Sequence, residues 1–124
     1  MCGIFVVIPK LNKKLNIQKC QNALKELDKR GPDWSLYQVI DNIFFGQTVL
    51  SMTGKSKKNL KNHYSQKKNF FILFNGEIYN HNDLNDYNYS DKLNIPDTKI
   101  LVDLFDRKNP NTINDSLDGM YSYV

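Results

Sequence analysis

Segments that would cross or pass through a membrane are missing from this sequence of 124 residues. No apolar run approaches the length of a bilayer span, which excludes a transmembrane segment. The apolar stretch at residues 3–8 follows no basic residues and precedes no small-residue cleavage site, so it is not a secretory signal. The sequence has only two cysteines, which we expect to be free thiols in a reducing compartment. We therefore expect a cytoplasmic protein without a membrane partner.

Arginine is also scarce, because lysine supplies nearly all of the 17 basic side chains and the formal net charge of +4. Lysine is abundant together with Asn, Ile and Tyr along the whole chain, which is typical of a coding preference and does not indicate an anionic partner. A nucleic-acid-binding module was considered and is disfavoured, since the lysines of residues 55–68 belong to one loop and no binding motif accompanies them. Cysteines and histidines lack ligand spacing, so we predict no metal site.

The pattern of apolar residues predicts an α+β fold. Apolar runs rich in β-branched and aromatic residues predict strands at residues 3–8, 36–40, 43–50, 70–74 and 120–124. Residues 36–40 and 43–50 read as a hairpin that turns at Asp41-Asn42. Three- and four-residue spacing predicts one amphipathic helix with Ile17, Cys20, Leu24 and Leu27, and a second with Ile100, Leu101, Leu104 and Phe105.

The second helix is expected to begin at Asp97 as its N-cap. Residues 53–68 are polar and lysine-rich, so they predict a long loop of the kind that often binds a ligand or forms a lid. Residues 80–94 are expected to be irregular or weakly helical. Because the chain stops at residue 124 inside a predicted strand, we expect the C-terminal part of the domain to be missing.

Cys2 is a candidate nucleophile. Removal of Met1 would free its α-amino group, and with pKa values of about 8.5 for a thiol and about 7.7–8.0 for an α-amine, one residue would supply both nucleophile and base. Gly3 permits close approach of a substrate to the backbone. The alternative is a small apolar residue at the start of a buried strand. Position alone favours that alternative.

Asn75-Gly76 is first of all a tight-turn signal. The functional alternative is an oxyanion hole, in which the Asn75 amide and the Gly76 N–H donate to a tetrahedral oxyanion. Residues 77–80 lack the strict alternation of a returning edge strand, which argues against a plain hairpin turn. Arg-Gly-Pro-Asp at residues 30–33 is by itself a helix stop followed by a turn.

Taken together, these motifs resemble a known family. Cys-Gly-Ile-Phe at residues 2–5 and Phe-Asn-Gly-Glu-Ile-Tyr-Asn-His at residues 74–81 are accompanied by Arg-Gly-Pro-Asp-Trp-Ser at residues 30–35, Asp-Thr at residues 97–98 and Leu-Asp-Gly-Met at residues 117–120. Their order and spacing closely resemble the class II (N-terminal nucleophile) glutamine amidotransferase domain of asparagine synthetases. The resemblance covers essentially the whole chain, residues 1–124, and Pro32 favours the asparagine synthetase branch.

The resemblance implies an N-terminal nucleophile hydrolase fold, an αββα sandwich that here would lack its C-terminal strands. Cys2 would attack the side-chain amide of L-glutamine, Asn75 and Gly76 would form the oxyanion hole, and Glu77 and Asp97 would hold the α-ammonium group. The ammonia would amidate aspartate in a synthetase domain. That partner domain, with its ATP and Mg, is not expected on this chain, so no cofactor is predicted here.

One segment departs from the family pattern of His-x-Arg-Leu-Ser-Ile, whose Arg pairs with the α-carboxylate of glutamine. Residues 47–52 read Gln-Thr-Val-Leu-Ser-Met, so Val49 stands where the Arg is expected, and Lys61-Asn62 stands where a Gln-Pro pair usually follows. The substrate-binding residues predicted in this segment are Val49, Leu50, Met52 and Thr53. Two explanations remain open. A lysine of the following loop meets the carboxylate, with candidates Lys55, Lys57 and Lys58, or the chain is a weakened or non-catalytic remnant with a binding or regulatory role.

Overall fold

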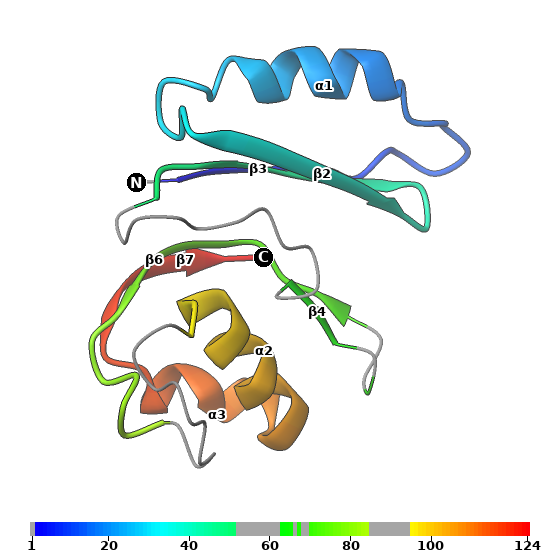
Figure 1. Cartoon of the computed structure of the whole chain (residues 1–124). Coiled ribbons are helices and arrows are strands. Elements are labelled where there is room, and N and C mark those ends of the chain that lie inside the picture. The colour runs from blue at the N-terminus through cyan, green and yellow to red at the C-terminus, as the bar shows by residue number, and fades with distance from the viewer. Residues whose placement is uncertain (1, 52–62, 66, 68–69, 85–94) are drawn as a thin grey trace. The chain divides into compact units, whose positions relative to one another are not determined.

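The structure is a computed structural model that describes residues 2–51, 63–65, 67, 70–84 and 95–124. The chain divides into two compact units (Figure 1). The N-terminal unit comprises residues 1–58 with Val124, and the C-terminal unit comprises residues 59–123. Each unit combines antiparallel strands with at least one helix, which confirms the α+β class.

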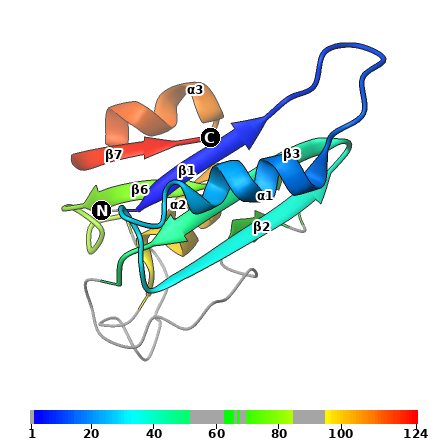
Figure 2. The same cartoon turned by 90° about the horizontal axis from the view of Figure 1, so that it is seen from above.

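The N-terminal unit is a three-stranded antiparallel sheet with one helix on it. Its elements are β1 (Gly3–Val7), α1 (Ile17–Lys25), β2 (Trp34–Ile40) and β3 (Ile43–Val49). The strand order is β1-β3-β2, and α1 packs against the central strand β3 (Figure 2). The predicted hairpin is confirmed. Asp41 and Asn42 both have positive φ, at 47° and 62°, as a two-residue type I′ turn requires.

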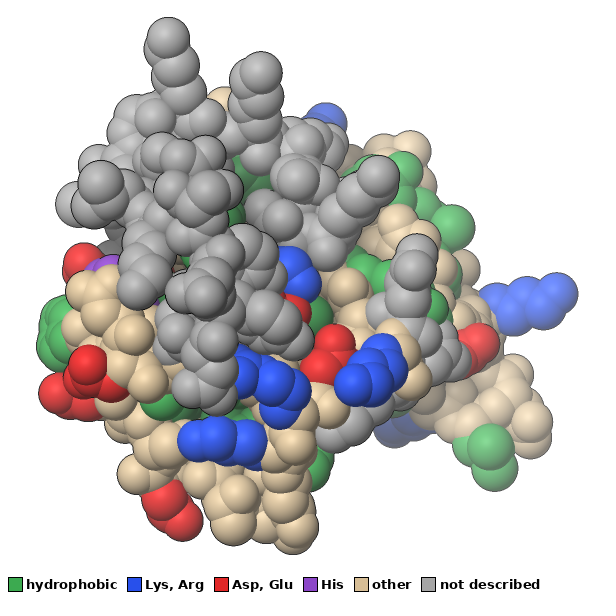
Figure 3. Space-filling view, turned by 60° about the horizontal axis from the view of Figure 1, so that its bottom comes forward, with side chains coloured by type: hydrophobic (Ala, Val, Ile, Leu, Met, Phe, Trp, Pro, Cys, Tyr) green, Lys and Arg blue, Asp and Glu red, His purple; other side chains and the backbone are tan. Residues whose placement is uncertain are grey.

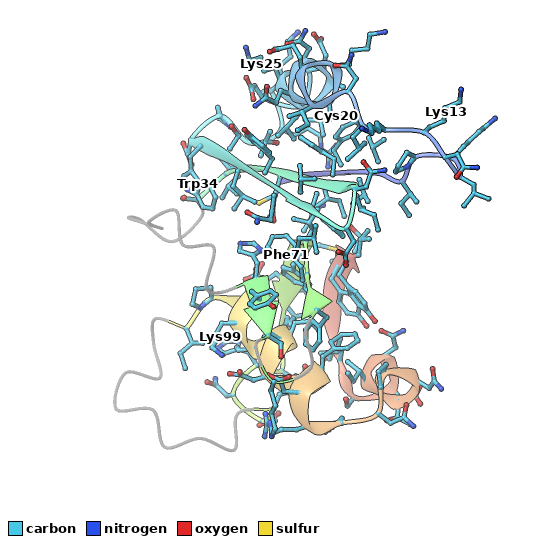
Figure 4. All side chains as sticks on the ribbon, turned by 90° about the vertical axis from the view of Figure 1, so that its right-hand side faces the viewer. Lys13, Cys20, Lys25, Trp34, Phe71 and Lys99 are labelled. Atoms are coloured by element: carbon cyan, nitrogen blue, oxygen red, sulfur yellow. The ribbon has the colours of Figure 1, made fainter. Side chains whose placement is uncertain are left out.

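Helix α1 buries one apolar stripe against the sheet. Cys20 and Leu24 pack on Phe44 of β3, and Figure 4 shows Cys20 pointing from the helix towards the strands. The Asn16 side chain caps the helix by accepting a hydrogen bond from the Lys19 N–H at 3.0 Å. The predicted stripe ran on to Leu27, but α1 ends at Lys25 and Leu27 lies in the turns that follow. Leu27 still packs against this core. The prediction that it is a core residue is therefore confirmed, and the prediction that it lies in the helix is wrong.

The C-terminal unit contains short strand pairs and helices. Its elements are β4 (Tyr64–Ser65), β5 (Phe70–Phe71), β6 (Phe74–Ile78), α2 (Asp97–Arg107), α3 (Pro110–Ile113), the 3₁₀ helix η2 (Asn114–Ser116) and β7 (Gly119–Tyr123). Strands β4 and β5 pair antiparallel, as do β6 and β7. Helices α2 and α3 lie on one side of the β6–β7 pair, and the apolar face of α2 forms much of the core (Figure 1).

The single strand predicted at residues 70–74 is wrong. Ile72 and Leu73 separate β5 from β6, and both are buried. The Ile72 N–H donates to the His63 carbonyl at 2.8 Å, and His63 Nδ1 donates to the Ile72 carbonyl at 2.9 Å. This exchange with residue 63 bends the chain out of β5. Apolar periodicity alone cannot show such a break, because both strands and the break are apolar.

The loop predicted at residues 53–68 is only partly described. Tyr64 and Ser65 form β4, so that part of the prediction is wrong, and residues 52–62, 66, 68 and 69 lie outside the described residues. Of residues 80–94, the first five form turns as expected and the rest lie outside the described residues.

The described surface carries charges of both signs. Figure 3 shows Lys and Arg side chains together with Asp and Glu side chains on one face. On α2, Lys99 forms an ion pair with Asp103 one turn further along the helix. Of the helices in the described part of the chain, none has the length and hydropathy needed to span a membrane.

Candidate functional site

In the N-terminal unit, the predicted nucleophile lies at the end of the sheet where β1 begins. Cys2 is a free, partly exposed cysteine directly before β1. Gly3 pairs with Thr48 of β3, and extending this register by one residue puts Cys2 across from Val49. The sheet therefore brings Cys2 and the start of the predicted substrate-binding segment to the same end.

The Arg-Gly-Pro-Asp segment contacts both of these strands. After α1 ends, Arg30 Nε donates to the Cys2 carbonyl at 3.3 Å. Gly31 lies against β3 so closely that a Cβ there would be 2.3 Å from the Val49 nitrogen. The Asp33 N–H donates to the Val49 carbonyl at 3.1 Å, and the Asp33 carboxylate accepts from the Ser51 N–H at 2.6 Å. The helix already ends at Lys25, so the segment is not the helix stop that was predicted, and it instead fixes the backbone of residues 2 and 49–51.

Val49 forms part of the buried interior of this unit. Its side chain is 7% exposed, and it pairs with Trp34 of β2 at the end of β3. An aliphatic side chain in this position offers no charge to a carboxylate. Leu50 follows and is partly buried, whereas Met52 and Thr53 lie outside the described residues, as do the candidate lysines 55, 57 and 58.

In the C-terminal unit, Asn75 and Gly76 lie inside a strand. Asn75 pairs with Ser122 and Gly76 pairs with Tyr121, so β6 continues without a turn to Ile78. The tight-turn interpretation of Asn75-Gly76 is therefore wrong, because five residues of β7 pair across this stretch. This leaves the two residues with some role other than reversing the chain.

The backbone at residue 76 admits only glycine. Gly76 has a φ of 152°, which L side chains rarely adopt. A Cβ on Gly76 would lie 2.2 Å from the Met120 carbonyl oxygen, well inside the closest approach of real atoms. Beside it, the Asn75 Oδ1 atom is buried and accepts no hydrogen bond from the described residues. A buried amide without such a partner costs stability, and such groups in native proteins call for a functional explanation.

Asp97 is not the N-cap of α2 as predicted. The N-cap is Pro96, which makes no side-chain capping bond, and Asp97 is the first helical residue. Its Oδ2 atom instead accepts from the Ile78 N–H at 3.0 Å, which links the start of α2 to the end of β6. Among the described residues, none donates a hydrogen bond to the other carboxylate oxygen, Oδ1. Asp97 therefore has one anchored oxygen and one that can accept from a ligand.

Burial controls the acidity of Asp97. Desolvation raises the pKa of its carboxyl above the ordinary value, while the Ile78 N–H and the charge of His81 lower it and the charge of Glu77 raises it. Glu77 itself is exposed in β6. The charges of Glu77 and His81 thus act on Asp97 in opposite directions at the end of β6.

Sequence reasoning gave no role to His81, Arg30 or Asp33. His81 Nδ1 donates to the Ile78 carbonyl at 3.1 Å, so Ile78 is bonded through its N–H to Asp97 and through its carbonyl to His81. His81 stood at the end of the motif at residues 74–81, but the resemblance assigned it no role. Arg30 and Asp33 stood in a recognised motif, but a turn already explained them.

The whole chain matches a family model described as "Glutamine amidotransferase domain", over residues 1–124. The chain belongs to this family. It is 34% identical to a probable glutamine-hydrolysing asparagine synthetase of Acanthamoeba polyphaga mimivirus and 31% identical to asparagine synthetase B of Escherichia coli K12. It is 26% identical to asparagine synthetase 3 of Arabidopsis thaliana.

Each of these alignments includes 100% of this chain. The chain spans 23%, 23% and 22% of the length of these three relatives, in the same order. They support the identification as the class II amidotransferase domain found in asparagine synthetases. Within the described residues of this amidotransferase domain, no three or more His, Cys, Asp or Glu side chains group together as metal ligands would.

Proposed function

We propose that this chain is the glutaminase domain of an asparagine-synthetase-type amidotransferase, which hydrolyses L-glutamine to glutamate and ammonia. The observation that carries the proposal is the position of Asn75 and Gly76 inside a paired strand, with a buried amide oxygen and a backbone that excludes every side chain. In a chain of this family that begins Met-Cys-Gly, the Asn75 amide nitrogen and the Gly76 N–H would be the hydrogen-bond donors that an acyl-transfer site needs.

Cys2 is the proposed nucleophile, once Met1 is removed. Its sulfur attacks the side-chain amide carbon of glutamine, and its own α-amine takes the thiol proton and passes it to the departing nitrogen. Collapse of the tetrahedral intermediate breaks the C–N bond and releases ammonia. Water then attacks the γ-glutamyl thioester, which releases glutamate and restores the thiol. Arg30 supports this step by fixing the Cys2 carbonyl.

Asn75 and Gly76 are the proposed oxyanion hole. The Asn75 side-chain amide and the Gly76 N–H would donate to the oxygen that becomes negative in the tetrahedral intermediate. Each such donor is worth roughly 10²- to 10³-fold in kcat. The effect requires donors that are already in place before the reaction, and pairing with β7 holds Asn75 and Gly76 in position.

Asp97 and Glu77 are proposed to bind the α-ammonium group of glutamine. Asp97 Oδ1, which accepts no hydrogen bond from the described residues, would offer a charge-assisted hydrogen bond to that cation. Beyond the substrate, we propose that residues 1–124 form one glutaminase domain with the αββα sandwich of N-terminal nucleophile hydrolases. Its ammonia would serve a synthetase domain that holds ATP, Mg and aspartate.

A second candidate function is a weakened or non-catalytic amidotransferase-like domain that binds or regulates. Burial of the aliphatic Val49 favours it, because this position gives no charged partner to the glutamine α-carboxylate. Loss of such a partner costs several kcal/mol of binding, about 2–5 kcal/mol in comparable charged contacts. The lysine candidates, which lie outside the described residues, remain a prediction.

Steady-state glutaminase kinetics on the Met-processed protein separate the two candidates. Release of glutamate and ammonia in equal amounts, with KM in the millimolar range or below, is expected for the glutaminase. Cys2→Ser is the matched control and should abolish turnover, while Cys20→Ser changes a buried thiol in the core and should retain it. No turnover above the Cys2→Ser background would establish the non-catalytic candidate instead.

A further inference from the structure

The end of β6 is buried and is held in place by two side-chain hydrogen bonds. Ile78 is 1% exposed, its N–H donates to Asp97 Oδ2 at 3.0 Å, and its carbonyl accepts from His81 Nδ1 at 3.1 Å. Movement of Ile78 would therefore move the Asp97 carboxylate. His81 therefore restrains the carbonyl of the same residue whose N–H is bonded to Asp97.

The turn that carries His81 is itself fixed to the start of β7. The Tyr79 N–H donates to the Asp118 carbonyl at 2.7 Å. Asn80 accepts from the Asp118 N–H at 2.9 Å and donates through Nδ2 to the Ser116 carbonyl at 3.0 Å. Because these bonds fix the backbone of Tyr79 and Asn80, they also fix the position of the His81 ring next to the Ile78 carbonyl.

Few charged groups act on Asp97 from the elements that pack against α2. From β6 comes Glu77, and from the turn after it comes His81. Strand β4 carries Tyr64 as its ionisable side chain, and α3 carries none. On α2 itself, Lys99 is paired with Asp103. The charge of His81 is thus the one in this set that favours the Asp97 anion, against burial and Glu77, which oppose it.

We propose that His81 is a positioning residue for the substrate ammonium group, because it holds Ile78 and, through Ile78, the Asp97 carboxylate in place. The inference rests on the proposed function, since it assigns the regulation of the same ammonium-binding carboxylate. The positive charge of His81 also lowers the pKa of the Asp97 carboxyl against the effect of burial, which favours the anion that binds an ammonium group. His81 therefore protects glutamine binding against acidification.

The test compares two His81 variants with a control on α2. His81→Asn keeps an N–H donor near the position of Nδ1 but removes the charge, whereas His81→Ala removes both. Lys99→Gln removes a cation that is bound to Asp103 and not to Asp97. Two readouts are used: the carboxyl ¹³C titration of Asp97 by NMR without glutamine, and the pH profiles of kcat and KM for glutamine.

In His81→Asn, the Asp97 titration should move to higher pH, and KM should rise about threefold over the wild-type value at pH 5.5, as loss of one partly exposed charge partner would give. The kcat at saturating glutamine should stay unchanged, and Lys99→Gln should match the wild type. In His81→Ala, the same pH shift should be joined by a lower unfolding temperature.

An Asp97 titration that is identical in the wild type and His81→Asn would overturn the inference. A KM that rises equally at every pH would also overturn it, because that is the signature of a structural role alone. The two proposals can fail separately. Absence of glutaminase activity at any pH would reject the proposed function, while the NMR titration would still decide the role of His81.

Discussion

The two units contribute different kinds of chemistry to the amidotransferase domain. In the N-terminal unit, residues 30–33 hold the carbonyls of Cys2 and Val49, because Arg30 Nε donates to the first and the Asp33 N–H donates to the second. The C-terminal unit holds a buried Asn75 amide oxygen that no described residue bonds and the Asp97 carboxyl, whose pKa is raised; beside them, Gly76 has a positive φ that L side chains rarely adopt. The comparison teaches that the N-terminal unit fixes the backbone beside the proposed nucleophile, whereas the C-terminal unit keeps a carboxyl whose charge is opposed by burial.

Gly76→Ala should have the largest effect on stability. The new Cβ meets the Met120 carbonyl at 2.2 Å in a conformation that alanine disfavours, so β6 and β7 must separate. We expect a loss of about 3 kcal/mol or more in the free energy of unfolding, measured by urea denaturation. Gly3→Ala is the matched control in the N-terminal unit, because its nearest contact is the Thr48 side chain at 2.8 Å. A Gly76→Ala protein as stable as Gly3→Ala would contradict the comparison.

Asn75→Ala should separate activity from stability. Loss of the amide donor should lower kcat by roughly 10²- to 10³-fold. The free energy of unfolding should change by less than about 1 kcal/mol, because the variant also removes a buried oxygen that no described residue bonds. Asn22→Ala on α1 serves as a control, since its side chain bonds only the neighbouring Gln18 among the described residues. Equal kcat values in both variants would remove Asn75 from the oxyanion hole.

Asp97→Asn should raise KM for glutamine by roughly 10-fold or more, because a charge-assisted bond to the ammonium group is lost. Its effect on stability depends on pH. Since the folded-state pKa of Asp97 is raised, its contribution to stability is full below the ordinary value of 3.8 and is lost as the pH rises through the folded-state pKa. The variant should lack this dependence. Unfolding curves of the wild type and of Asp97→Asn at pH 4 and pH 7 test this prediction. The same change in the free energy of unfolding between these two pH values in both proteins would contradict it.

The smallest effect is expected at His63. Desolvation lowers the pKa of this buried histidine, which stacks on Phe71, below its ordinary value of 6.5. Its contribution to stability is therefore full above pH 6.5 and is lost as the pH falls through the folded-state pKa. His63→Gln, which keeps a donor for the Ile72 carbonyl, should flatten the fall in unfolding temperature between pH 7.5 and pH 5. An unchanged slope would show that another group causes the fall.

The sequence predicted the elements that depend on neighbouring residues and failed where residues far apart in the sequence make contact. The Asp41-Asn42 hairpin and the strand at residues 3–8 depend on local pattern, and both were predicted within one or two residues. Asn75-Gly76 is a turn in most local contexts, and only the distant strand β7 makes it part of a sheet. Asp97 has the residue type of an N-cap, yet its carboxylate bonds Ile78, which is 19 residues earlier. Contacts between residues far apart in the sequence decided the last two cases, Asn75-Gly76 and Asp97.

The roles of the site residues were predicted through the family resemblance, while their neighbours were not. Nothing in local pattern reveals that Arg30 reaches the Cys2 carbonyl or that His81 reaches Ile78, because each contact requires the folded turn that carries it. The substitution at Val49 was visible in the sequence. The burial of Val49 beside Trp34 was not visible. Because it is buried, Val49 belongs to the apolar interior of the sheet and leaves no charged side chain at this position.

The most direct test of the central claim is covalent labelling of Cys2. A glutamine analogue with a diazoketone in place of the side-chain amide should alkylate the Met-processed protein once, as measured by intact mass and peptide mapping. Buried Cys20 is the control thiol in the same chain. We predict an adduct on Cys2 alone, slowed by excess glutamine and absent in Cys2→Ser. No adduct, or labelling of Cys20 at the same rate, would contradict the assignment of this chain as a glutaminase.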